Sequence, residues 1–184
     1  MAYFPLFVDI KNRNILVVGG GKVALRKIEK LLPFNPKITV IAKKVKEDKI
    51  RQLALTGKIN LYERQFSQED LENQDVVIVA VDDLNLQREI YNLCIKSNIP
   101  VNSVDSIQYC SFIFPAYVKK GDIVIGISTS GKAPALSAAL KDIIEDALPE
   151  NIEQIKEVLE EIRKKYPKGK ERQTLIMEKL KELL

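Results

Sequence analysis

The chain has 184 residues, of which 46% are hydrophobic and 29% charged, and its formal net charge is +4. This composition is ordinary for a globular protein, and the length suffices for one domain with a smaller appendage. The mild charge, without a block of like charges, argues against a nucleic-acid partner and suits a small anionic ligand.

Three further properties argue against a membrane protein, a secreted protein and a metal-binding protein. No segment reaches the roughly 20 apolar residues of a membrane span, and the N-terminus lacks a secretory signal pattern, so no membrane partner and a cytoplasmic location are expected. Cys94 and Cys110, the only cysteines, lack metal-ligand spacing, and the chain has no histidine. We therefore predict no metal site, and acid–base chemistry falls to Asp, Glu, Lys, Tyr or Cys.

In the first part of the chain, predicted strands and helices alternate. The apolar run 4–10 reads as an edge strand or hairpin arm. Strands are predicted at 14–18, 37–41, 59–62, 75–81 and 100–104, and helices at 22–32, 46–55 and 84–97. We place Leu84, Ile90, Leu93 and Cys94 in the core. Such alternation predicts an α/β fold, a Rossmann-like doubly wound parallel sheet, over residues 1–112.

A glycine cluster follows the first strand of this sheet. Gly19, Gly21 and Ala24 fit the pattern G-x-G-x-x-[G/A], which binds dinucleotides. Glycine at these positions permits a tight turn and a close approach of pyrophosphate, and the following helix offers unpaired N–H groups. Glycine clusters also mark plain turns, but the strand before and the helix after favour a cofactor site formed by Gly19, Gly20, Gly21, Lys22 and Val23.

The loop after the second strand should meet the adenine ribose. It carries Ala42, Lys43 and Lys44 in place of the acidic residue that would bind the 2′-hydroxyl of NAD. These lysines are either two solvated side chains or a site for the 2′-phosphate of NADP.

From residue 113 the pattern changes. Strand-like runs at 112–118 and 122–128 predict an antiparallel pair, and Pro134 suits the first turn of a helix with Leu136, Leu140, Ile143, Ile144 and Leu148 turned inward. Two more amphipathic helices are predicted at 152–166 and 175–184. We therefore divide the chain into an NAD-binding domain, 1–112, a small α+β dimerisation and substrate-binding segment, 113–149, and a C-terminal helical region, 150–184. The apolar faces need a second surface, which favours a homodimer.

Residues 1–149 contain six short motifs, one after another along the chain. They are Pro5-Leu6-Phe7, Val17-Val18-Gly19-Gly20-Gly21, Asp82-Asp83, Val101-Asn102-Ser103-Val104-Asp105, Phe112-Ile113-Phe114-Pro115-Ala116 and Ile127-Ser128-Thr129-Ser130-Gly131-Lys132. In these motifs the sequence resembles the precorrin-2 dehydrogenase family, the N-terminal part of siroheme synthase. It departs from that family in having Ala133 where serine is usual and Val81 where threonine is frequent.

The resemblance implies NAD-dependent oxidation of precorrin-2, a tetrapyrrole, to sirohydrochlorin in siroheme biosynthesis. It further implies NAD, with backbone groups at Lys43 and Lys44 on the ribose, and a homodimer. The family's catalytic aspartate falls on Asp105, which otherwise reads as a turn residue, and Asp82 joins the cofactor residues.

The loop of Ser128, Thr129, Ser130, Gly131 and Lys132 is either a plain connection or a donor-rich site for substrate carboxylates. Two alternatives to the dehydrogenase stay open: a bifunctional enzyme that also inserts Fe²⁺, as a ferrochelatase, and a non-catalytic dinucleotide-sensing module.

Overall fold

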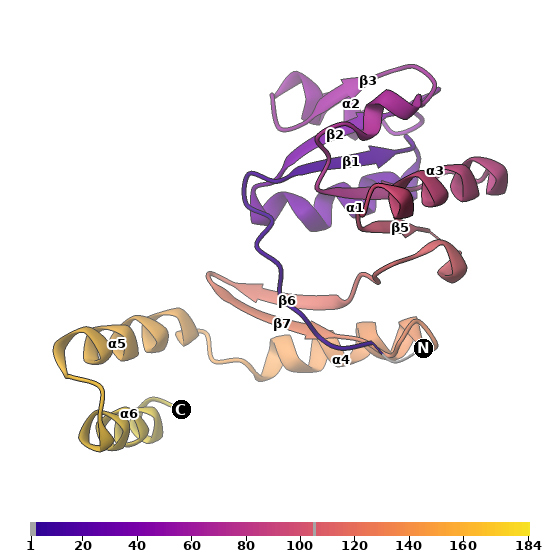
Figure 1. Cartoon of the computed structure of the whole chain (residues 1–184). Coiled ribbons are helices and arrows are strands. Elements are labelled where there is room, and N and C mark those ends of the chain that lie inside the picture. Colours follow the sequence, from indigo (N-terminus) through magenta and orange to yellow (C-terminus); the bar gives the residue numbers. More distant parts are fainter. Residues whose placement is uncertain (1–2, 105) are drawn as a thin grey trace. The chain divides into compact units, whose positions relative to one another are not determined.

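The computed structural model describes residues 3–104 and 106–184, which form two compact units. One unit is Leu6–Phe114, and the other combines residues 3–5 with Pro115–Leu184. Figure 1 labels their helices and strands. No helix in the described ranges has the length and apolar character needed to cross a membrane.

The unit Leu6–Phe114 is built on a parallel sheet in the order β3-β2-β1-β4-β5. Its strands are β1 (Asn14–Val18), β2 (Lys37–Ile41), β3 (Asn60–Tyr62), β4 (Val76–Val79) and β5 (Val101–Ser103). Three helices connect them: α1 (Lys22–Leu31), α2 (Asp48–Leu55) and α3 (Leu84–Lys96). Short 3₁₀ turns occupy Leu32–Phe34, Gln68–Leu71 and Ile107–Tyr109. The Rossmann-like prediction is thereby confirmed.

Helices cover both faces of the sheet because the central strands are apolar on both sides. Ile15 and Val17 of β1 pack with Ile28 of α1 and Ile50 of α2 in one core. Leu16 and Val18, which alternate with them, pack with Ile90 and Cys94 of α3 in the other. The chain leaves β1 toward β2 and returns beside β1 as β4, so the strand order reverses between β1 and β4. In sheets of this kind, ligands bind where the order reverses, at the carboxyl ends of the strands.

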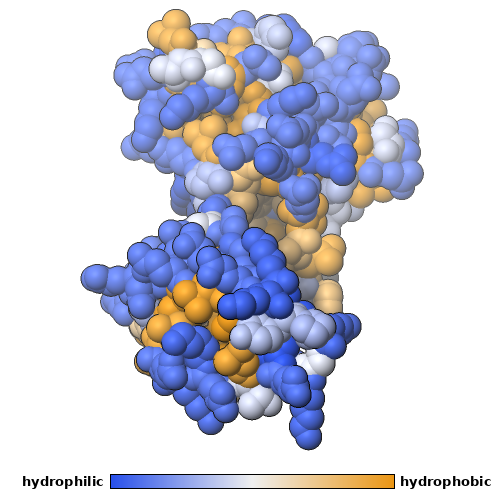
Figure 2. All heavy atoms as spheres, turned by 90° about the vertical axis from the view of Figure 1, so that its left-hand side faces the viewer, coloured by the Kyte–Doolittle hydropathy of each residue, from blue (hydrophilic) through white to orange (hydrophobic). Residues whose placement is uncertain are grey.

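The other unit pairs β6 (Ala116–Lys120) with β7 (Ile123–Ile127) in antiparallel register, as predicted. Three helices follow: α4 (Pro134–Ala147), which packs on this pair, α5 (Ile152–Lys165) and α6 (Lys170–Leu183). An ion pair of 2.5 Å between Lys156 of α5 and Asp122 fastens α5 to the hairpin turn. Figure 2, viewed from the side of α5 and α6, shows apolar side chains gathered within the hydrophilic surface of this unit. Met177 of α6 and Leu184 are exposed.

Three local predictions were wrong. Residues 4–10 form no strand: Pro5 has no N–H for strand pairing, Asp9 instead accepts a hydrogen bond from Lys11 N, and Phe4, Leu6 and Phe7 are 85%, 76% and 70% exposed. Leu84, the first residue of α3, is 61% exposed, since the buried stripe of that helix runs through Gln87, Ile90 and Cys94. On α4, Leu136, Leu140 and Ile143 are exposed within this chain and do not point inward as predicted.

Candidate functional site

The turn after β1 depends on Gly19. Its φ of +131° lies in a region that side chains other than glycine rarely adopt, and a Cβ at this position would overlap the carbonyl of Ala80. Hydrogen bonds from Gly19 N to Ile41 O, 2.8 Å, and from Ala80 N to Val18 O, 2.7 Å, fix the turn between the neighbouring strands. The first glycine of the pattern is therefore required by the backbone.

Gly20 has a different role, which the sequence did not indicate. A Cβ there would lie 2.8 Å from the carbonyl oxygen of Lys44 and 2.9 Å from the Cα of Val45. The Lys46 N–H donates to Gly20 O at 2.7 Å. The glycine turn and the loop after β2 thus pack backbone to backbone, which sets Lys43 and Lys44, both exposed, beside the turn.

Gly21 faces open space, with no atom within 4 Å of a Cβ built on it. It is the N-cap residue of α1, and no side chain of the described residues accepts a hydrogen bond from the first N–H groups of this helix. The first turn begins with Lys22 and Val23 and contains no acidic residue. The first N–H groups of a helix point outward without intrahelical partners and attract anions. Ala24 is fully buried, so α1 packs closely on the sheet. This arrangement fits a dinucleotide pyrophosphate.

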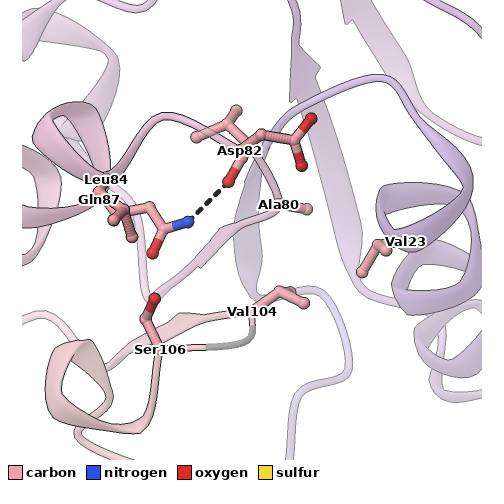
Figure 3. A pocket seen from close by; sticks show the side chains of 8 residues that line it. Val23, Ala80, Asp82, Leu84, Gln87, Val104 and Ser106 are labelled. Carbon is pink, nitrogen blue, oxygen red and sulfur yellow. Dashed lines mark hydrogen bonds between the residues drawn. The ribbon is translucent and has the colours of Figure 1, made fainter.

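A pocket opens beside the turn, at the place where the strand order reverses (Figure 3). Its apolar walls come from the start of α1, the end of β4, the start of α3 and the residues after β5, namely Val23, Ala80, Val81, Leu84 and Val104. Asp82, Gln87 and Ser106 add polar groups. Asp83, next to Asp82, instead caps α3 by accepting hydrogen bonds from Asn85 N and Leu86 N at 2.9 and 3.2 Å.

Asp105, the predicted catalytic residue, lies outside the described residues. Its chain neighbours Val104 and Ser106 both line the pocket. Nearby, the Cys110 thiol donates to Ser103 O at 3.1 Å. Burial raises the pKa of this thiol, while the Ser103 N–H and the charge of Lys27 oppose the rise. Cys110 therefore serves the packing around β5 as a neutral thiol.

The predicted substrate loop lies in the other unit, between β7 and α4. Ser130 and Gly131 adopt positive φ angles of 55° and 75°, and Lys132 is exposed. The Thr129 hydroxyl accepts a hydrogen bond from Ala133 N at 3.2 Å and lies 3.0 Å from the Ser137 hydroxyl. Thr129 thus ties the loop to the start of α4, whose N-cap residue Ala133 supplies no side-chain cap.

The structure accordingly brings five of the predicted residues together at the carboxyl ends of β1 and β2: Gly19, Gly20, Gly21, Lys43 and Lys44. Val23 and Asp82 line the adjoining pocket. Sequence reasoning missed Gln87 and Ser106. The sequence did carry a signal for Gln87, because an amide side chain shares a helical stripe with Ile90 and Cys94, which are both fully buried.

Comparisons with known proteins agree with this geometry. A family model described as NAD(P)-binding matches residues 6–116, and a model described as sirohaem biosynthesis protein, central, matches residues 120–147. Among solved structures, SirC, a precorrin-2 dehydrogenase, superposes with a TM-score of 0.76 at 28% identity, covering 96% of this chain and 88% of that one.

Curated relatives carry the name siroheme synthase. The protein from Ruthia magnifica is 41% identical over 149 residues, which is 81% of this chain and 31% of that protein. The protein from Pseudoalteromonas atlantica is 39% identical over 163 residues, covering 89% of this chain and 35% of its own length. The chain thus spans about a third of the length of these relatives.

Proposed function

We propose, on the premise that the chain belongs to the NAD(P)-binding family of sirohaem biosynthesis proteins, that it oxidises precorrin-2 to sirohydrochlorin with NAD⁺. The observation that carries the proposal is the open glycine turn at the N-terminus of α1, which no described side chain caps. This turn occurs in a chain that superposes along nearly its whole length on a precorrin-2 dehydrogenase. Such a pathway enzyme would work in the cytoplasm.

Each predicted site residue has a role in this reaction. The bound dinucleotide supplies a hydride acceptor. Gly21, Lys22 and Val23 hold its pyrophosphate through backbone N–H groups, and Asp82 lines its pocket. Asp105 accepts the proton that leaves the tetrapyrrole with the hydride, because the chain has no histidine to act as the base.

The loop from Ser128 to Lys132 would bind the carboxylates of the substrate. The side chains of Ser128 and Lys132 are exposed and can donate to an anion. Thr129 is the weaker candidate, because its hydroxyl already serves the N-terminus of α4.

The adenosine end of the site favours NAD in this proposal, with backbone groups of Lys43 and Lys44 on the ribose. The competing NADP would place its 2′-phosphate on the two lysine side chains. Calorimetry with both dinucleotides, repeated on Lys43→Ala and Lys44→Ala, distinguishes them. We expect tighter binding of NAD⁺, little changed by either substitution. Tighter binding of NADP⁺ that both substitutions weaken would establish the phosphate site instead.

The activity is tested by mixing the protein with precorrin-2 and NAD⁺ and recording the absorption spectrum of sirohydrochlorin. We expect product in stoichiometric amount with NADH. Dinucleotide binding without product would favour a dinucleotide-sensing module. Among the described residues, no group of three His, Cys, Asp or Glu side chains is placed to hold a metal ion. Fe²⁺ insertion stays an open alternative, and a measurement of whether the protein speeds Fe²⁺ or Co²⁺ insertion into sirohydrochlorin decides it.

A further inference from the structure

Gln87 is a polar residue in a position that α3 otherwise reserves for its core. It is 3% exposed and lies on the same helical stripe as Ile90 and Cys94, which are fully buried. A glutamine in such a stripe loses the hydration of both amide atoms, and this is unfavourable unless each atom finds a partner.

One of the two amide atoms has a partner. Gln87 Nε2 donates to the carbonyl oxygen of Val81 at 2.7 Å, which ties the loop after β4 to α3 (Figure 3). The opposite atom, Oε1, is buried and accepts no hydrogen bond from any described residue. Because Nε2 is held by Val81, the amide is oriented, and Oε1 must present its lone pairs on the other side. A buried carbonyl oxygen without a donor costs free energy, so the site favours a ligand that brings one.

The surroundings of this oxygen indicate which ligand. Gln87 lines the pocket at the point where the strand order reverses, beside the glycine turn that fits a pyrophosphate. Val23, Ala80 and Val104 give the pocket apolar walls, which suit a flat ring. Leu84, at its edge, is 61% exposed, and such a side chain changes rotamer readily when a ligand enters.

We infer that Gln87 selects the nicotinamide carboxamide of the dinucleotide, with Oε1 accepting a hydrogen bond from the carboxamide NH₂ group. The inference rests on the dinucleotide-binding part of the proposed function and adds a specificity-determining residue to it. An amide ligand fits better than a carboxylate, since an anion offers no donor to Oε1. Gln87 acts through cofactor recognition and transfers no proton itself.

The experiment compares two cofactors and two proteins. In 3-acetylpyridine adenine dinucleotide a methyl group replaces the carboxamide NH₂, so the donor is lost while the ring stays. Calorimetry gives the dissociation constants of this analogue and of NAD⁺ for the wild type and for Gln87→Met. We expect the wild type to bind NAD⁺ about 3- to 10-fold more tightly than the analogue, as one neutral hydrogen bond allows. Gln87→Met should bind both alike.

The ratio of the two constants isolates the amide contact. Gln87→Met also frees the Val81 carbonyl, but that loss affects both cofactors and cancels in the ratio. Gln52→Met, the same exchange at an exposed glutamine on α2, should keep the wild-type ratio. Should Gln87→Met fail to fold, Gln87→Glu retains an acceptor oxygen and should still prefer NAD⁺.

Equal affinities in the wild type, or a preference that persists in Gln87→Met, would overturn the inference. Neither result depends on precorrin-2. If the wild type discriminates between the cofactors, Gln87→Met does not, and the wild type forms no sirohydrochlorin, the oxidation proposal fails while the assignment of Gln87 stands.

Discussion

The three glycines after β1 are needed for three different reasons, and this makes one of them a clean probe. Gly19 is fixed by its positive φ and Gly20 by its contact with Lys44 and Val45, so side chains at either would disturb the fold. Gly21 has open space around it and a φ of −101°, so a side chain fits there. Only at Gly21 can ligand binding be altered without strain on the turn.

Gly21→Asp should separate folding from binding. Aspartate is a favourable N-cap residue, so the melting temperature should be unchanged or raised. The carboxylate would stand where the pyrophosphate is proposed to bind, and like charges in a site cost several kcal/mol, so NAD⁺ affinity should fall by ~100-fold or more. Calorimetry and thermal melting measure the two effects.

Gly169→Asp is the matched control for this variant. Gly169 is the N-cap residue of α6, also with no atom within 4 Å of an added Cβ, and its backbone is extended. The substitution should cap that helix and leave NAD⁺ binding unchanged. Unaltered affinity in Gly21→Asp would remove the pyrophosphate from this turn.

Asp105→Asn tests the proposed proton acceptor. Asparagine keeps the shape and hydrogen-bonding reach of aspartate but lacks its basic oxygen. NAD⁺ affinity and dimerisation should therefore survive, while the rate of sirohydrochlorin formation should fall ~10²–10⁴-fold, as expected for a lost general base. Asp83→Asn, at the N-cap of α3, serves as control because asparagine caps equally well. Turnover near that of the wild type in Asp105→Asn would show that the proton goes elsewhere, such as to water.

Among the elements, the loop before α4 is held to that helix by one hydroxyl. The Thr129 hydroxyl accepts a hydrogen bond from Ala133 N and lies 3.0 Å from the Ser137 hydroxyl. Thr129→Val removes the hydroxyl at nearly constant volume and should lower the free energy of unfolding by about 1 kcal/mol. Urea denaturation measures this loss, and Thr129→Ser should restore most of it. An unchanged stability with a raised KM for precorrin-2 would instead make the hydroxyl a substrate contact.

The elements also show where sequence patterns suffice. The central strands β1 and β4 were predictable because burial on both faces demands unbroken apolar runs such as Ile15 to Val18. The run 4–10 is apolar apart from Pro5 and Asp9, and these two residues break the pattern that the buried strands keep. The glycine turn was readable as a motif. The contact of Gly20 with the loop after β2 was not, since it joins two loops that follow different strands.

The unpaired oxygen of Gln87 lay beyond sequence reasoning for a related reason. Helical periodicity indicates that residue 87 shares a stripe with Ile90 and Cys94, but not which partners each amide atom finds. Whether a buried polar atom finds a hydrogen-bond partner depends on the distances between segments, here between α3 and the loop after β4. Candidate sites read from motifs are therefore expected to omit residues of this kind.

At the scale of the whole molecule, the exposed apolar face of α4 is a feature that the single chain leaves unexplained. Leu136, Leu140 and Ile143 are 52%, 36% and 63% exposed, and they lie on one side of the helix. We propose that a second copy of the chain covers this face, because symmetric dimers bury identical patches against each other.

Ile143→Lys should therefore weaken the dimer while the fold of each chain persists. A charged side chain in the middle of an apolar interface costs several kcal/mol, so the dimer dissociation constant should rise by ~100-fold or more. Light scattering over a range of micromolar concentrations should report a dimer for the wild type and a monomer for the variant. Leu55→Lys is the matched control, since Leu55 is 88% exposed at the end of α2, far along the chain from α4. A wild type that scatters as a monomer throughout this range would leave the apolar face of α4 without its proposed partner.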